Sequence, residues 1–153
     1  MRAAVVEAYH VPTGSMRPTI HEGDRILGSK FHYRFWEPRT GDVVVFRAPE
    51  AVRRLSSHDA DRLVKRVIAT DGDFVEVSRG VVRVNGRILD EPYVAAPPDY
   101  ELPRFRVPAG HVFVLGDNRN NSLDGHVWGF LAEEDLLARA FVRYWPPGRM
   151  GAL

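Results

Sequence analysis

The chain has 153 residues, a length typical of one domain and sufficient to bury a core without disulfides or structural metals. It carries 21 basic and 20 acidic residues, and this formal charge of +1 gives no electrostatic case for nucleic acid as a partner. It has no cysteine, which excludes a cysteine nucleophile, a thiolate zinc site and a disulfide framework. No apolar run approaches the roughly 18 residues of a membrane span.

Short apolar runs separated by turn residues predict an all-β, mostly antiparallel, compact and strand-rich fold. The 13 glycines and 11 prolines break the chain into many short strands. The predicted strands are, in chain order, residues 25–27, 43–46, 63–69, 74–77, 81–84, 87–89, 112–115 and 138–145. Residues 1–153 are therefore expected to form a single domain.

Three segments depart from this strand pattern. Residues 49–62 have few apolar anchors and are expected to be a mobile loop. Hairpin turns at Arg79-Gly80 and Asn85-Gly86, followed by four prolines in 95–108, predict a reduced hairpin and proline-rich insertion near 74–108. Acidic residues at the start of 132–137 favour a short helical turn near the C-terminus.

Four aromatic residues lie close together early in the chain: Phe31, Tyr33, Phe35 and Trp36. Aromatic side chains of this kind gather at membrane interfaces. They would equally form the face of a strand packed on the core, and the sequence leaves both interpretations open.

Ser15 lies in a rigid, irregular piece of backbone, because Pro12 and Pro18 bracket it together with Gly14. Taken alone, this pattern is typical of an ordinary turn serine.

Lys65 and Arg66 are neighbours in a predicted strand, so they point to opposite faces. If Lys65 points inward with Leu63 and Val67, desolvation lowers its pKa and makes it a potential general base. If Arg66 points inward instead, Lys65 is simply exposed. Periodicity does not decide between these alternatives.

The polar segment 116–129 follows a predicted buried strand and is dense in turn-forming residues. Asp117 or Asp124 could pair with Arg119 to hold it together, with Ser122 presented at the strand end. It would equally be a hydrogen-bonded loop without chemistry.

Three segments in this order resemble the motifs of type I signal peptidase: PTGSMRPT (12–19), VKRVI (64–68) and GDNRNNSLD (116–124). The resemblance covers the chain from Tyr9 to Trp145, and residues 118–128 most resemble the cyanobacterial and thylakoid members. These are Ser/Lys serine endopeptidases, a variant of catalytic-triad logic.

The resemblance implies a strand-rich catalytic domain with Ser15 as the nucleophile and neutral Lys65 as its general base. Ser122 would orient the lysine amine, and the Ser15 N–H with the Thr13 hydroxyl would form the oxyanion hole. It also implies residues that bind an extended substrate ending in Ala-x-Ala, namely Tyr9, Val11, Pro12, Met16, Ile20, Leu63 and Val64. Asp117, Arg119 and Asp124 would have structural roles at the site.

The resemblance further implies its partners and its place in the cell. The substrates would be the signal peptides of exported preproteins, with the membrane surface and the secretion translocon as further partners. Cleavage would occur on the outer face of the cytoplasmic membrane or in the thylakoid lumen, and we expect a membrane-anchoring helix upstream of Met1. No cofactor is implied, and the six histidines predict no metal site. Gly125 stands where many members have serine.

Three alternatives remain at the level of sequence. A self-cleaving repressor of the LexA type would share Ser/Lys chemistry, although the 116–119 motif argues against it. His126 with Asp124 could activate Ser15, although their separation of two residues predicts an awkward geometry. An inactive β-rich module that binds extended peptides is the third.

Overall fold

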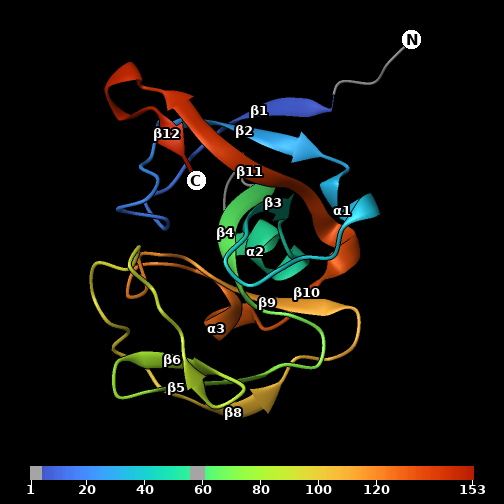
Figure 1. Cartoon of the computed structure of the whole chain (residues 1–153), viewed down its shortest axis with the longest axis vertical. Coiled ribbons are helices and arrows are strands. Elements are labelled where there is room, and N and C mark those ends of the chain that lie inside the picture. Colours follow the sequence, from blue (N-terminus) through green and yellow to red (C-terminus); the bar gives the residue numbers. More distant parts are fainter. Residues whose placement is uncertain (1–4, 56–60) are drawn as a thin grey trace.

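Antiparallel pairing of short strands builds almost the whole molecule (Figure 1). The structure is a computed structural model, and it describes residues 5–55 and 61–153. The larger sheet has eight strands, in the spatial order β1 (Val6–His10), β2 (Arg25–Lys30), β11 (Leu136–Trp145), β3 (Val43–Arg47), β4 (Arg62–Ala69), β9 (His111–Leu115) and β10 (Leu131–Ala132), with β12 (Gly151–Ala152) paired to β11. The predicted all-β, antiparallel fold class is confirmed.

A second, four-stranded sheet occupies the predicted insertion near 74–108. Its order is β7 (Arg87–Ile88), β6 (Val81–Val84), β5 (Phe74–Ser78) and β8 (Leu102–Arg106). Arg79-Gly80 and Asn85-Gly86 all have positive φ, between 52° and 81°, as a two-residue type I′ hairpin turn requires. Strand β8, which contains Pro103, lies at the edge of this sheet, where a missing N–H is tolerated.

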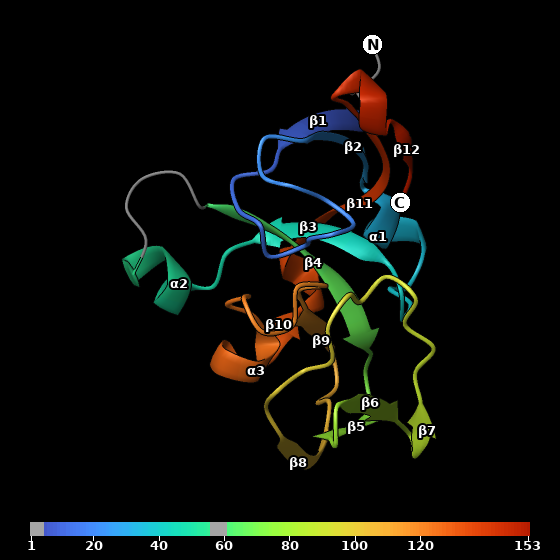
Figure 2. The ribbon, with the colours of Figure 1, turned by 90° about the vertical axis from the view of Figure 1, so that its left-hand side faces the viewer.

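The helices are short: α1 (His32–Phe35), α2 (Glu50–Leu55), α3 (Gly125–Trp128) and the 3₁₀ turns η1 (Glu133–Asp135) and η2 (Pro147–Arg149). Figure 2 shows α2 and α3 projecting from the same side of the molecule. The helical turn predicted at 132–137 is reduced to η1, because β11 begins at Leu136.

The loop predicted at 49–62 is wrong for its first half, which forms α2. Val52 supplies the anchor that the prediction overlooked, since its side chain is buried in the core against β3 and β4. Residues 56–60, which belong to the same predicted loop, lie outside the described residues.

The aromatic segment forms α1 and not a strand, so the predicted strand face is wrong. Tyr33 packs on the core and its hydroxyl donates to Asp42 at 3.0 Å. Phe35 and Trp36 are 76% and 57% exposed, and an interfacial role for these two remains a prediction.

Strand β4 lies at the centre of the packing. Its side chains enter all three hydrophobic clusters of the core, Val64 in one, Leu63 and Val67 in the next, and Ile68 with Ala69 in the third. Because both faces of the strand are covered, burial does not alternate along it.

Two free strand edges face a common groove. Strand β1 pairs on one side with β2, and β4 pairs with β3 along its first half, while its pairing with β9 begins only at Arg66. Among the described strands, none pairs with the other edge of β1 or of residues 62–65. Tyr9, Pro12 and Val64 line a cavity between these two edges.

Candidate active site

Ser15 stands at one end of this groove, in the loop between β1 and β2. Asn118 ties the loop to the segment after β9, because its backbone N–H donates to the Ser15 carbonyl at 2.9 Å and its side-chain amide to the Gly14 carbonyl at 3.1 Å. Ser15 is nearly buried, and Lys65 Nζ donates to its Oγ at 2.6 Å.

Lys65 points inward, which is the first of the two alternatives that the sequence left open, and only 2% of the residue is exposed. Desolvation lowers the pKa of its amine to about 8, although the negative charges of Asp124 and Asp117 act in the opposite direction. A much larger fraction of neutral amine is therefore present near neutral pH than for a free lysine. A neutral amine in contact with a hydroxyl is able to accept its proton.

Thr13 lies directly beside the serine. Its hydroxyl donates to Ser15 Oγ at 3.2 Å, and the Ser15 backbone N–H points toward Thr13 Oγ1 at 3.5 Å. The two donors predicted for an oxyanion hole are thus adjacent.

Ser122 is at the site, but the hydrogen bond predicted from it to the Lys65 amine is not formed. Its Oγ is buried without a hydrogen-bond partner among the described residues. It is packed tightly, since a Cβ added at Gly116 would lie 2.2 Å from Ser122 Oγ and 2.5 Å from the Ser15 carbonyl oxygen.

Arg66, the strand neighbour of Lys65, is also buried, and Asp117 neutralises it. The guanidinium donates to both carboxylate oxygens of Asp117 at 2.9 and 2.8 Å. The Thr19 hydroxyl donates to the same carboxylate at 2.6 Å, and the Tyr93 ring lies 3.6 Å from the Arg66 guanidinium carbon. This network joins the serine loop, β4 and the segment that begins at Gly116.

Arg119 pairs with Glu91, so the predicted pairing with Asp117 or Asp124 is wrong. Two bonds of 2.9 and 2.5 Å join the guanidinium to the Glu91 carboxylate, and Arg119 Nε donates to the Gly116 carbonyl. Glu91 lies 28 residues before Arg119, in the connection between β7 and β8, so no local sequence pattern indicates this pairing.

Asp124 accepts the Gly116 backbone N–H at 2.8 Å and contacts His126 Nδ1 at 2.5 Å. The awkward geometry predicted for this Asp–His pair is therefore wrong, because the turn at the start of α3 brings the two side chains together. The His126 ring stacks on Tyr100, with centroids 4.0 Å apart. Ser15 Oγ accepts hydrogen bonds from Lys65 and Thr13, and not from His126.

The residues predicted to bind substrate divide into two groups. Tyr9, Pro12, Leu63 and Val64 line the groove cavity or the cavity of about 240 Å³ at Ser15. Val11, Met16 and Ile20 line neither of these two cavities, because they are buried in the core cluster beneath the groove.

Sequence reasoning missed several residues of the site. Val52 lines the cavity at Ser15, and its i, i+3 spacing with Leu55 is the helical signal that could have revealed it. Glu91 and Tyr93 carry no recognisable motif, and only the tertiary structure brings them to Arg119 and Arg66.

The described ranges, 5–55 and 61–153, contain no group of three or more acidic or histidine side chains placed to hold a metal ion. Within the same ranges, no helix has the length and apolarity needed to cross a membrane.

A serine hydroxyl beside a buried amine, at the end of a groove between free strand edges, is the arrangement of a serine peptidase. The chain matches the family model described as "Signal peptidase, peptidase S26" over residues 1–145. It belongs to the signal peptidase I family.

Relatives from cyanobacteria and chloroplasts resemble the whole chain. "Probable signal peptidase I-2" of Synechocystis sp. is 49% identical over 153 residues, covering 100% of this chain and 69% of the relative. "Thylakoidal processing peptidase 1, chloroplastic" of Arabidopsis thaliana is 41% identical and covers 97% of this chain and 45% of the relative. The crystal structure of a signal peptidase I from Enterococcus faecalis is similar with a TM-score of 0.54 at 26% identity, covering 68% of this chain and 97% of that one.

Proposed function

We propose that this signal peptidase removes N-terminal signal peptides from preproteins after small residues of the Ala-x-Ala type, with Ser15 as the nucleophile and neutral Lys65 as the general base. The observation that carries the proposal is the 2.6 Å contact between Lys65 Nζ and Ser15 Oγ, made by an amine that is almost fully buried.

The reaction begins when the neutral amine accepts the proton of the Ser15 hydroxyl as Oγ attacks the carbonyl carbon of the scissile bond. The ammonium of Lys65 then gives this proton to the departing amine of the mature protein, which leaves an acyl-enzyme on Ser15. In the second half, Lys65 removes a proton from water as the water oxygen attacks the carbonyl carbon of the acyl-enzyme. The ester bond to Ser15 Oγ then breaks, the ammonium of Lys65 returns the proton to Oγ, and the signal peptide leaves with a new carboxylate.

Charge on the substrate oxygen is stabilised by two donors. In the free protein the Thr13 hydroxyl donates to Ser15 Oγ and the Ser15 backbone N–H donates to Thr13 Oγ1, and both donate to the oxyanion instead when it forms. One such donor typically contributes about 3 kcal/mol of transition-state stabilisation.

The substrate lies extended between β1 and the first half of β4, where both strands offer unpaired backbone groups. Leu63 and Val52 wall the cavity at Ser15, and its modest volume of about 240 Å³ favours small side chains before the cut. Ser122 fixes the direction of the amine once substrate binds and the site tightens.

The same proposal places the reaction on the outer face of the cytoplasmic membrane or in the thylakoid lumen, with the membrane surface and the secretion translocon as partners. The similarity to a thylakoidal processing peptidase supports the lumenal alternative. Residues 1–153 act as one catalytic domain, without a cofactor.

The experiment is cleavage of a purified preprotein in detergent by the wild type and by Ser15→Ala, Lys65→Ala and His126→Ala. We expect no cleavage from the first two variants and retained cleavage from the third. Loss of cleavage in His126→Ala together with activity in Lys65→Ala would favour the Asp124–His126 alternative. A wild type that binds the peptide without turnover would be an inactive peptide-binding module, and one that cuts only itself would be a LexA-like protein.

A further inference from the structure

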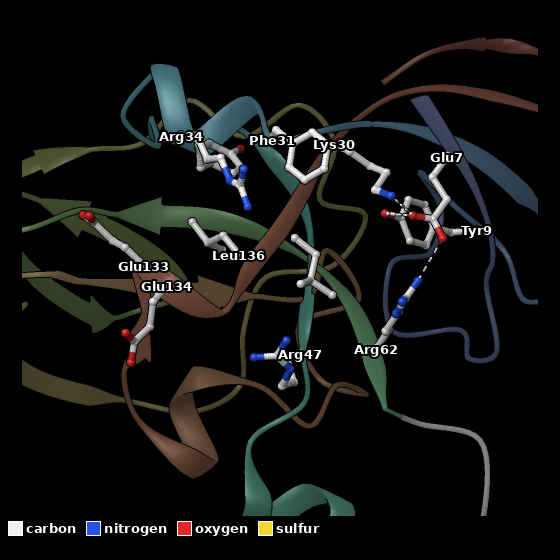
Figure 3. Close-up of a pocket in the computed structure, with 12 residues that line it drawn as sticks. Glu7, Tyr9, Lys30, Phe31, Arg34, Arg47, Arg62, Glu133, Glu134 and Leu136 are labelled. Carbon is white, nitrogen blue, oxygen red and sulfur yellow. Dashed lines mark hydrogen bonds and ion pairs between the residues drawn. The ribbon is translucent and has the colours of Figure 1, made fainter. Parts of the chain in front are cut away.

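The groove extends beyond the cavity at Ser15, which favours small side chains. Tyr9 and Arg62 line both the groove cavity beside Val64 and a second cavity of about 440 Å³ that lies beyond them (Figure 3). We call this second space the distal cavity; its charged walls include Glu7, Lys30, Arg34, Arg62, Glu133 and Glu134. The lining therefore changes along the groove from largely apolar to charged.

Among the residues that line the distal cavity, basic side chains (Lys30, Arg34, Arg47 and Arg62) outnumber acidic ones (Glu7, Glu133 and Glu134), whereas Asp61 lines only the groove cavity on the other side of Arg62. Arg62 Nη1 donates to Glu7 Oε1 at 3.2 Å, and Lys30 Nζ lies 3.5 Å from the other carboxylate oxygen. Two cations thus share one carboxylate, and Figure 3 shows them converging on it. A guanidinium has five N–H donors, and the remaining donors of Arg62 have no acceptor among the described residues.

The pKa of Glu7 reports the sign of this local field. Partial burial alone would raise it, but the hydrogen bond from Arg62 and the charges of Lys30 and Arg62 bring it below its ordinary value. A carboxylate at this point is therefore stabilised in spite of its partial desolvation.

Position along β4 identifies the part of the substrate that meets Arg62. Arg62 precedes Lys65 by three residues in the strand, which corresponds to about 10 Å. If the scissile carbonyl lies at Ser15 and the residues before the cut run along the groove toward the start of β4, an extended peptide brings the fourth residue before the cut to Arg62. The fifth and sixth residues then enter the distal cavity.

We propose that the distal cavity is a specificity subsite for the fourth to sixth residues before the scissile bond, and that Arg62 with Lys30 selects acidic over basic side chains there. This inference rests on the proposed function, because it uses the same groove and places the scissile bond at Ser15. Glu133 and Glu134 stand on η1, across the cavity from Arg62 in Figure 3, so they meet a side chain only farther along.

The test uses preprotein-derived peptides that share one Ala-x-Ala site and carry Glu, Gln or Lys at the fourth and fifth positions before the cut. We expect kcat/KM of the wild type to fall in the order Glu, Gln, Lys, by about two- to fivefold at each step, the range of exposed ion pairs. The differences in kcat/KM among the three peptides should decrease at high salt, where such ion pairs are screened.

Variants assign this preference to the residues named. Arg62→Glu should invert the order and Arg62→Gln should reduce it, whereas Glu7→Gln should steepen it by freeing both cations. Arg87→Glu makes the same charge change at an exposed position of the second sheet and should leave the order unchanged.

The outcomes distinguish failure of the distal subsite from failure of the proposed function. Equal cleavage of all three peptides, a preference for Lys, or an unchanged order in Arg62→Glu would each overturn the distal subsite and leave the proposed function intact. Failure of the wild type to cleave any of the peptides, under conditions in which the preprotein is also not cut, would refute the proposed function itself.

Discussion

Replacing Lys65 by methionine should stabilise the protein while abolishing cleavage. In the unfolded chain the amine has an ordinary pKa of about 10.5, whereas desolvation in the folded state lowers it to about 8, with Asp124 and Asp117 opposing that shift. A difference of about 2.5 units corresponds to about 3 kcal/mol of lost stability at pH 7. Loss of the hydrogen bond to Ser15 offsets about 1 kcal/mol, so we expect a net gain of about 2 kcal/mol.

The loss of stability caused by the buried, protonated amine of Lys65 decreases as the pH rises. Between about pH 8 and 10.5 the unfolded chain binds more protons than the folded one, so the stability of the wild type rises with pH across this window. Below pH 8 both states are protonated and the whole penalty is present. The advantage of Lys65→Met should therefore be largest at pH 7 and disappear near pH 10.5.

Urea unfolding at pH 7 and at pH 10.5 measures both effects. Lys30→Met is the control, because the only other lysine is one-third exposed and its replacement should change stability by less than about 0.5 kcal/mol. The acidic limb of kcat/KM for the wild type should lie near pH 8. The reasoning would be refuted if Lys65→Met were less stable than the wild type at pH 7. It would also be refuted if the difference in free energy of unfolding between the two proteins were the same at both pH values.

Other substitutions probe the rest of the site. Thr13→Val should lower kcat about 100-fold with little change in KM, and Thr13→Ser should restore it in peptide-cleavage kinetics. Glu91→Gln should lower the free energy of unfolding by about 3 kcal/mol, since it leaves a buried arginine unpaired, while Glu50→Gln in an exposed pair should cost under about 0.5 kcal/mol. Gly116→Ala should reduce both melting temperature and activity because its Cβ meets atoms at 2.2 and 2.5 Å, whereas Gly148→Ala meets nothing within 4 Å and should change neither. Unchanged melting curves for Glu91→Gln or Gly116→Ala would contradict the packing described.

The strands and turns of this protein follow from local sequence. Asn85-Gly86 specifies a hairpin because asparagine and glycine both adopt the positive φ of a type I′ turn readily, whereas at Arg79-Gly80 only the glycine does; β-branched runs beside both turns favour extended backbone. The signal peptidase motifs likewise identified the family, since their residues stand in a fixed order along the chain.

Local pattern was less informative where tertiary contacts decide the conformation. The aromatic segment became α1, and α2 formed in a stretch where Val52 supplies a buried apolar anchor. Both helices are too short to be stable alone, so their formation depends on packing that the sequence window does not contain.

The chemistry of the site shows the same division. The sequence by itself determined that Ser15, Lys65 and the 116–124 segment belong together, and it left the burial of Lys65 open because a period of two residues does not say which face is inward. Only the tertiary structure decided that both faces of β4 are covered, that Glu91 pairs with Arg119, and that Arg62 stands over the groove beside Glu7. Desolvation and ion pairing depend on atoms tens of residues away, whose proximity is set by the path of the chain.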